Sequence, residues 1–349
     1  MLEISFTVKD VARTRLAISP LWEVVASAKV LKAARPDPLY RRWAETVRPR
    51  LTGAGPGVRL LFDLIQPCWY LPDFLSPPPL TPVPDLTAEL TGLRDLPADQ
   101  IRADLDVLAH ALTHPVSSLE QVTRPRRRSA GPMRSAPSAR VASLYDDPPD
   151  GLGLLASGIE TYWRIAIEPW WGRIRATLDG DLVHRGRQLA NGGHALLLDD
   201  LSPRVRWHDG VLRIRHLRFS GHRRLHGEGL LLVPSAFAGQ HVTSNTIPPW
   251  QPSLVYPARG LGAIWQPERV DPPEAVSRVI GRSRTTLITH LESPRSTTDL
   301  AARTGLTPGG VSQHLGALHD AGLVSAHRAR RSVLYARTEL AEALLGGGR

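Results

Sequence analysis

The hydrophobic pattern of the first 190 residues is mainly helical. Residues 2–8 alternate between apolar and polar positions, which predicts a short strand, and Asp10 is expected to cap a helix that follows it to about Ala17. Apolar residues then return at helical spacing, which predicts helices at 20–32, near 38–47, at 93–111 and at 152–189 with an interruption near Pro169.

The pattern changes after Gly193. Apolar runs on either side of His208-Asp209-Gly210 predict a hairpin of strands at 205–207 and 211–215. Further strands are expected at 229–233 and 253–256, whereas seven prolines between Pro67 and Pro84 predict an irregular loop. Residues 1–265 are therefore expected to form a mixed α/β domain.

A second domain is expected at 270–346. Asp271-Pro272-Pro273 should open a helix whose apolar stripe is Val276, Ile280, Leu287 and Leu291, and Pro294 should end it. Ser296, with Asp299 three residues later, predicts the start of a short helix at 298–304, and Gly305 can adopt the positive φ of a tight corner.

Thr307-Pro308 predicts the start of the next helix, with Thr as the N-cap and Pro at the first helical position. Its apolar positions are Val311, Leu315 and Leu318, and Gly322 should end it. Two short helices joined by a turn containing Gly form the helix-turn-helix pattern. Strands at 324–328 and 333–337 follow, with the wing between them.

Charge supports a polyanionic partner for this domain. The whole chain has 43 basic and 33 acidic residues, but only three of the basic residues are lysines, and such an arginine bias is typical of GC-rich coding. Between residues 282 and 337 there are eight arginines and three acids, and arginines of this kind supply affinity for DNA phosphates.

Residues 305–315 (GLTPGGVSQHL) and 318–324 (LHDAGLV), together with the arginine-bearing wing that ends in Val333-Leu334-Tyr335, resemble the arsenical-repressor (ArsR/SmtB-type) winged-helix family. This resemblance covers about one fifth of the chain. Residues 13–23 (RTRLAISPLWE) resemble the opening of larger regulators of this kind, whose N-terminal domain is poorly characterised.

The resemblance implies a homodimer that reads a dyad-symmetric operator on double-stranded DNA with a recognition helix at 308–321 and a wing at 324–337. Its dimer contacts would come from 275–291 and 339–345. The implied DNA-contacting residues are Arg303, Thr307, Gly309, Gly310, Ser312, Gln313, His314, Arg328, Arg330, Arg331 and Tyr335. Gln313 is the best base reader, because its amide can pair bidentately with adenine.

Two features depart from the metal-sensing members of that family. Residues 297–304 contain no Cys-x-Cys pair, and the last helix contains no His, so no metal and no cofactor are expected at those sites. The pair Gly309-Gly310 also weakens the start of the recognition helix, by up to ~1 kcal/mol for each glycine. It either lets the DNA backbone approach closely or reduces base readout.

Other candidate chemistry has two readings each. His216, His222 and His226, with Glu228 nearby, lack the spacing of a known metal motif and are expected to be surface or interface residues. Cys68, the only cysteine, is either a small buried hydrophobe or a redox sensor. The tryptophans 22, 43, 69, 163, 170 and 171 either pack in the core or line a pocket.

Two arginine-rich segments are also open to two interpretations. Residues 124–140 contain six arginines and no acid, so they form either a solvated insertion or an arm that contacts nucleic acid. Residues 204–224 contain seven arginines against Asp209 alone. They form either a solvated hairpin face or a second surface for DNA or for an anionic ligand.

The sequence therefore predicts an α+β chain with a C-terminal winged helix-turn-helix, acting as a DNA-binding transcription regulator and not as an enzyme, with no catalytic residues. A small-molecule effector in the N-terminal domain is possible. The alternatives are an enzyme that uses the winged helix as a structural module, and a weakly specific architectural DNA-binding protein. No signal peptide and no run of ~18 apolar residues is found, so a cytoplasmic protein without membrane contact is expected.

Overall fold

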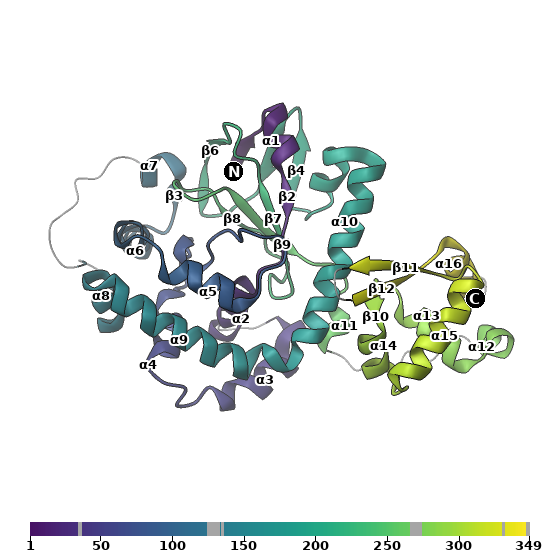
Figure 1. Cartoon of the computed structure of the whole chain (residues 1–349). Helices are drawn as coiled ribbons and strands as arrows, with labels where there is room; N and C mark the ends of the chain where they lie inside the picture. The colour runs from purple at the N-terminus through teal and green to yellow at the C-terminus, as the bar shows by residue number, and fades with distance from the viewer. Residues whose placement is uncertain (34–36, 124–132, 134–135, 266–273, 330–331, 347–349) are drawn as a thin grey trace. The chain divides into compact units, whose positions relative to one another are not determined.

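A computed structural model describes residues 1–33, 37–123, 133, 136–265, 274–329 and 332–346 (Figure 1). The chain divides into two compact units. The first, here called the sheet unit, comprises Met1–Pro169 and Gln188–Pro257, and the second, the winged unit, comprises Trp170–Arg187 and Ala258–Arg349. Residues 170–187 thus belong to the winged unit, although their place in the sequence predicts them as part of the domain at 1–265.

The sheet unit contains two sheets. The five-stranded sheet has the order β3-β6-β1-β5-β4, made of Ser117–Ser118, Phe219–Arg224, Leu2–Ser5, Val211–Ile214 and Val205–His208. The four-stranded sheet has the order β2-β7-β9-β8, made of Arg15–Leu16, Leu231–Ser235, Ser253–Pro257 and Thr243–Asn245. Both sheets mix parallel and antiparallel pairs, so the predicted α+β class is confirmed.

The N-terminal strand lies in the middle of the first sheet. β1 pairs antiparallel with β5 and parallel with β6, and the alternating Leu2 and Ile4 are fully buried. The predicted hairpin is confirmed as β4 and β5, with Asp209 and Gly210 both at positive φ in its two-residue turn, as that turn type requires. Strand β6 was not predicted, because its glycine, histidine and arginines obscure any alternation, and β8 was not predicted because it has only three residues, all of them polar.

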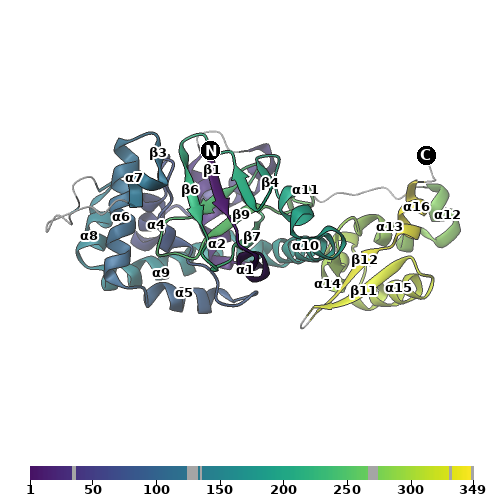
Figure 2. The same cartoon turned by 90° about the horizontal axis from the view of Figure 1, so that it is seen from above.

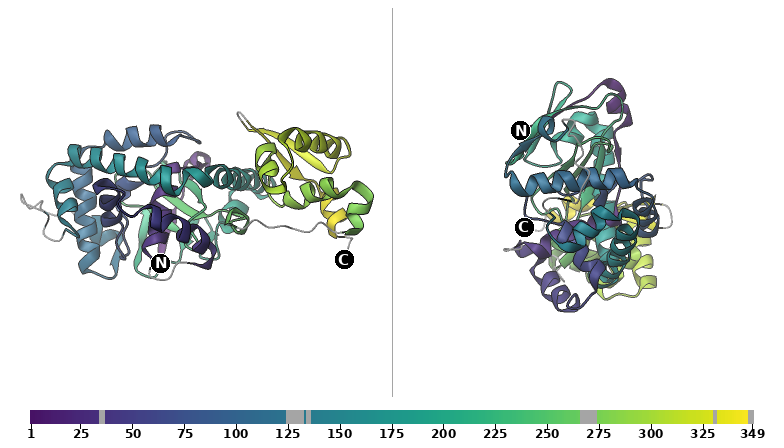
Figure 3. Two further views of the ribbon diagram at one scale, coloured as in Figure 1. Left: turned by 90° about the horizontal axis from the view of Figure 1, so that it is seen from below. Right: turned by 90° about the vertical axis from the view of Figure 1, so that its left-hand side faces the viewer.

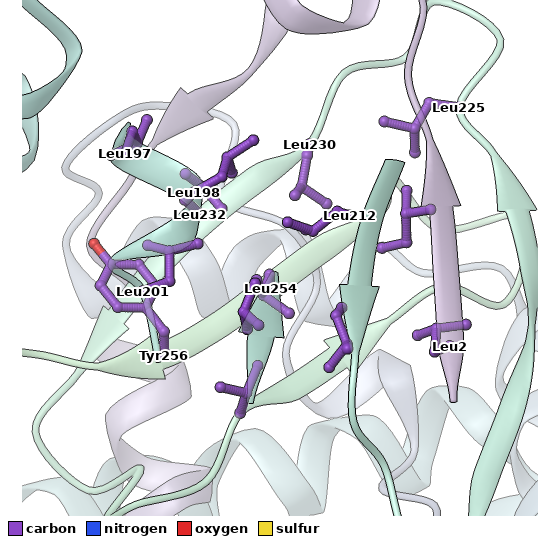
Figure 4. Packing of buried hydrophobic residues seen from close by; sticks show 14 residues of the cluster. Leu2, Leu197, Leu198, Leu201, Leu212, Leu225, Leu230, Leu232, Leu254 and Tyr256 are labelled. Atoms are coloured by element: carbon purple, nitrogen blue, oxygen red, sulfur yellow. The ribbon is translucent and has the colours of Figure 1, made fainter. Parts of the chain in front are cut away.

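The core of this unit is formed between the sheets. It joins β1, β4 and β5 to β7 and β9, and Leu197, Leu198 and Leu201 close it from the end of a long helix (Figure 4). Tyr256 lies in the same cluster and is fully buried. Burying apolar surface of this extent is what holds the two sheets together.

Helices form the rest of the sheet unit, and most of them lie together beside the strands, whereas α1 lies apart from them, next to the strands near the N-terminus (Figures 1 and 3). They are α1 (Val8–Arg13), α2 (Pro20–Lys32), α3 (Arg41–Arg50), α4 (Pro56–Leu64), α5 (Leu86–Arg94), α6 (Ala98–Thr113), α7 (Leu119–Thr123), α8 (Ala139–Asp146) and α9 (Pro148–Ala166). Short 3-10 turns are found at Pro38–Tyr40, Asp73–Leu75 and Glu168–Trp170.

Helix α9 is the centre of this layer, since α2, α3, α4, α5, α6 and α8 all contact it. It crosses α4 where Gly57 and Gly158 meet. A Cβ atom on either glycine would collide with backbone atoms of the other helix, so the crossing requires residues without side chains.

Several predicted boundaries were wrong. Thr7, and not Asp10, caps α1, and Asp10 lies three residues later as its partner in a capping box. The helix ends at Arg13 and does not continue to Ala17. The helix expected at 93–111 begins at 98, after the separate α5. Most of the arginine-rich segment 124–140 lies outside the described residues.

Helix α10 (Trp171–Asp199) contributes residues to both units. Gly193, at φ 64 and ψ −162, interrupts it, and the helix continues beyond the point where the sequence pattern changes. The winged unit further contains α11 (Gly262–Trp265), α12 (Glu274–Ile280), α13 (Arg282–His290), α14 (Thr297–Thr304), α15 (Pro308–Asp320) and α16 (Glu339–Gly346), with β10 (Arg295–Ser296), β11 (Val324–Ala329) and β12 (Ser332–Arg337).

Candidate nucleic-acid interface

The winged unit has its own core, on which α13, α14 and α15 pack. Val276, Leu287, Leu300, Val311 and Leu315 are buried in one cluster, and Leu306 packs against it. The single helix expected from residue 271 to Leu291 was wrong, because Gly281 at φ 87 separates α12 from α13. Residues 271–273 lie outside the described residues.

Local sequence signals fix both helices of the helix-turn-helix. The Ser296 side chain accepts a hydrogen bond from the Asp299 amide (3.2 Å) at the start of α14, and Gly305 ends this helix in the left-handed conformation at φ 73. Thr307 Oγ1 accepts from the Gly310 amide (3.2 Å), and Pro308 is the first residue of α15. Both predicted starts are confirmed.

A buried charge cluster holds α14 in place. Asp299 accepts from Arg295 Nη1 (2.9 Å) and from Arg303 Nε (3.0 Å), and all three side chains are buried. Arg295 Nε also donates to the His290 carbonyl (2.7 Å), which ties α14 to α13. Burial is the main cause that lowers the pKa of Arg303, and the positive charge of the neighbouring Arg295 lowers it as well.

Arg303 was expected to contact DNA, but this side chain serves the packing of α14. Its ion pair and burial leave little of the guanidinium for a phosphate. We therefore leave Arg303 out of the candidate surface.

The exposed face of α15 is the candidate reading surface. Ser312 and Gln313 are exposed, together with Gly309, Gly316 and Asp320, at the three- and four-residue spacing of one helix face. Gly316 was missed by sequence reasoning, although its position in this periodicity could have indicated it. The face is built of small residues, and Gln313 is its longest side chain.

Two other predicted residues, Gly310 and His314, are less accessible. Gly310 is half-buried beneath the side chain of its cap Thr307, which is itself exposed. His314 is also half-buried, and its Nδ1 has no hydrogen-bond partner among the described residues. His314 is thus placed at the border between the core and the exposed face.

The wing is a three-stranded sheet of order β10-β12-β11, seen beside α15 in Figure 2. Strand β10 was not predicted. Arg328 is exposed on β11 opposite Val333, whereas Tyr335 is half-buried and packs against the core cluster, opposite Ala326. The predicted contacts Arg330 and Arg331 lie outside the described residues.

The structure does not bring the candidate metal residues together. Among the described residues no group of three or more His, Cys, Asp or Glu side chains could hold a metal ion. His222 Nε2 lies 2.7 Å from Ser5 Oγ, and His216 Nε2 lies 3.0 Å from Ser244 Oγ. Cys68 donates to the Tyr70 carbonyl (3.1 Å), and burial raises the pKa of its thiol.

A capped helix-turn-helix followed by a β-hairpin wing defines a DNA-binding domain of the winged-helix class, and the predicted winged helix is confirmed. Residues 283–326 match the bacterial regulatory protein, arsR family. Residues 1–262 match the family of unknown function DUF5937, and the chain belongs to this family. No curated protein and no solved structure matches the chain significantly.

The arsR-family domain makes a DNA-binding transcription regulator the function class that these findings support. In the part of the chain that the structure describes, no helix is long and apolar enough to cross a membrane.

Proposed function

We propose that the protein is a homodimeric transcription regulator, and not an enzyme, that reads a dyad-symmetric operator with α15 and the wing. The observation that carries the proposal is the exposed face of α15 with Ser312 and Gln313, next to a hairpin that carries Arg328. In winged helices of this class the second helix enters the major groove, where Gln can pair with adenine. Binding to chromosomal DNA also agrees with the expected cytoplasmic location.

The test is fluorescence anisotropy of the purified chain with DNA from upstream of its own gene and with a scrambled duplex, at two salt concentrations. A specific regulator should prefer the native duplex by about 10³-fold or more. Gln313→Ala should weaken this binding by about 1–3 kcal/mol. Gln240→Ala is the matched control, because Gln240 is an exposed glutamine of the sheet unit.

Arg328→Gln distinguishes a contact with the DNA phosphates from a contact that reads the bases. Loss of a phosphate contact should weaken binding to both duplexes alike and reduce the salt slope by about one. Equal binding of the wild type to native and scrambled DNA would favour a weakly specific architectural DNA-binding protein. The small side chains of the α15 face are also consistent with that alternative. Absence of binding to either duplex at low salt, where phosphate contacts are strongest, would contradict DNA binding.

The dimer is proposed to form through α12, α13 and α16. Val279 on α12 is 77% exposed and Leu340 on α16 is 58% exposed, although both are large apolar residues. We predict that Val279→Asp and Leu340→Asp shift the protein toward monomers in analytical ultracentrifugation, because a buried carboxylate disfavours association. Leu80→Asp, at a position that is 94% exposed in the sheet unit, should leave the oligomeric state unchanged. A monomeric wild type would refute this part of the proposal.

A further inference from the structure

The sheet unit contains a cavity of about 500 Å³. Its walls come from the end of α2, the segment that follows α4, the connection between β5 and β6, and residues 241–247 around β8. This volume is in the range of cavities that bind small organic molecules.

Four cationic side chains line this cavity: Lys29, Arg204, Arg215 and Arg218. Within the described residues none of the four forms an ion pair with an acid. The single acid among the lining residues is Asp73, and burial together with the neighbouring Asp104 raises its pKa well above the ordinary value. Both effects favour the neutral form of Asp73, which weakens its opposition to the positive charge.

The cationic groups act on a common region. Burial is the largest cause that lowers the pKa of His216 to about 4, and the positive charges of the N-terminus, Arg204 and Lys29 contribute to the same shift. The pKa of His241 is lowered by burial and by the same two cations. Both histidines line the cavity, so at neutral pH they supply neutral hydrogen-bonding groups beside an excess of positive charge.

An aromatic wall faces the same cavity. The Trp69 ring stacks on Phe219, with 5.2 Å between centroids and an interplanar angle of 17°, and Tyr70 follows in the chain. Of the six tryptophans considered for a pocket, Trp69 lines this cavity, whereas Trp22 and Trp43 are buried in the core. A flat apolar body would be in contact with such a wall.

Two buried polar atoms of the lining residues have no hydrogen-bond partner within the described part of the chain. They are Oγ1 of Thr246, a residue that is 1% exposed, and Oδ2 of Asp73, which is 3% exposed. Buried polar atoms are almost always paired in proteins, and a bound molecule would pair them here.

We propose that this cavity binds a small organic anion, a carboxylate or phosphate on a flat aromatic body, as the effector of the regulator. The basic side chains would bind the anionic group through charge-assisted hydrogen bonds, and Trp69 and Phe219 would contact the ring. The role as effector rests on the proposed regulatory function, whereas binding of the anion does not. Of the two interpretations of the arginine-rich segment 204–224, this assigns Arg204, Arg215 and Arg218 to an anionic ligand.

Isothermal titration calorimetry of the full chain tests the proposal with 2-naphthoate, and with 2-naphthamide as its uncharged counterpart. We expect naphthoate to bind at least about tenfold more tightly, because only the carboxylate forms charge-assisted hydrogen bonds. Titration with 2-naphthyl phosphate then shows which anionic group is preferred. Equal affinity for naphthoate and naphthamide, or no heat with any of the three, would overturn the proposal.

Variants locate the site. Arg204→Gln and Arg218→Gln should each weaken naphthoate about tenfold or more, as expected for the loss of a charge-assisted hydrogen bond, and leave naphthamide unchanged. Arg206→Gln is the matched control, since Arg206 is an exposed arginine of β4 outside the cavity lining. A loss in Arg206→Gln as large as in Arg204→Gln would overturn the assignment to this cavity.

Circular dichroism spectra and thermal melts establish that each variant is folded. If a glutamine variant does not fold, Trp69→Phe provides the second test, because it keeps an aromatic ring and should reduce the affinity for naphthoate and naphthamide alike. Anisotropy with DNA in the absence of ligand reports on the DNA-binding proposal separately, so failure of one proposal is distinguishable from failure of the other.

Discussion

Glu23 is a buried carboxyl group whose titration should affect the stability of the protein. It is fully buried in the first turn of α2, where its carboxyl accepts from the Ala236 amide at 3.0 Å. Burial raises its pKa from 4.5 to about 8, against the lowering effect of that hydrogen bond. The group is therefore mostly protonated in the folded protein at neutral pH.

This raised pKa predicts a dependence of stability on pH. The folded state binds the proton more tightly than the unfolded state, so the contribution of Glu23 is fully present below about pH 4.5 and is lost as the pH rises toward about 8. Within this window the wild type should lose up to about 1.4 kcal/mol per pH unit relative to Glu23→Gln. Urea unfolding at pH 5, 6.5 and 8 measures the difference.

Glu45→Gln is the control for this prediction, because Glu45 is exposed on α3. Its difference from the wild type should stay constant across the same pH range. A constant difference for Glu23→Gln as well would show that the buried carboxyl does not titrate in this window.

Residues with a local role were predictable from the sequence, and residues with a tertiary role were not. Ser296, Gly305 and Thr307 were identified correctly because a cap or a tight corner depends on a few neighbouring positions. The ion pair of Arg303 with Asp299 was missed, because whether an arginine four residues after an acid is buried depends on the packing of α14. Three of the four cations of the cavity belong to the arginine-rich segment 204–224, which is evident from the sequence, but Lys29 and the aromatic wall come from distant segments, which periodicity cannot bring together.

At the scale of elements, long periodic segments were predictable and short ones were not. Helices α2 and α15 and the hairpin of β4 and β5 agree with the expected ranges to within one residue. Strands β3, β8 and β10 have two or three residues each, too few to show an alternation, and exist only because a neighbouring strand pairs with them. Helices α12 and α13 share one apolar stripe, which hid the break at Gly281.

The start of α15 provides a prediction at this scale. A Cβ atom on Gly309 would meet nothing within 4 Å, so Gly309→Ala should stabilise the winged unit by about 0.5–1 kcal/mol in thermal or urea unfolding. If the glycine allows close approach of the DNA backbone, the same variant should weaken operator binding about tenfold or more. Higher stability would then accompany lower affinity.

Gly316→Ala is the matched control on the same helix face, and a Cβ atom at Gly316 also meets nothing within 4 Å. It should stabilise α15 equally but leave DNA binding nearly unchanged, because base contacts in helix-turn-helix proteins concentrate near the N-terminus of the recognition helix. Unchanged DNA affinity in both variants would show that the glycines do not serve close approach of the DNA backbone. Reduced base readout would then be the remaining interpretation of the pair Gly309-Gly310.

For the whole molecule, the question is how an anion in the sheet unit could affect DNA binding by the winged unit. Helix α10 belongs to both units. Within the winged unit Asp181 accepts from the Arg259 amide (3.1 Å), and within the sheet unit Leu197 and Leu198 are part of the core. Helix α10 is thus held in both units, although Gly193 interrupts it between Asp181 and Leu197, and a shared helix of this kind is a physical route along which binding at one site can bias the other.

We therefore predict reciprocal coupling between the two proposed sites. If naphthoate changes operator affinity by some factor, operator DNA must change naphthoate affinity by the same factor, typically 5–150-fold in coupled proteins. Anisotropy at saturating naphthoate gives one factor, and calorimetry with the protein–DNA complex gives the other. Gly186→Pro should abolish the coupling and preserve each binding alone, because proline breaks α10 next to the boundary between the units.

Gly186→Ala is the control for that variant, since Gly186 is exposed and a Cβ atom there meets nothing within 4 Å. Alanine strengthens the helix, so the coupling should persist or increase. Coupling that survives in Gly186→Pro would show that α10 is not the route. Two binding events that do not influence each other, even in the wild type, would separate the anion from regulation while leaving both sites intact.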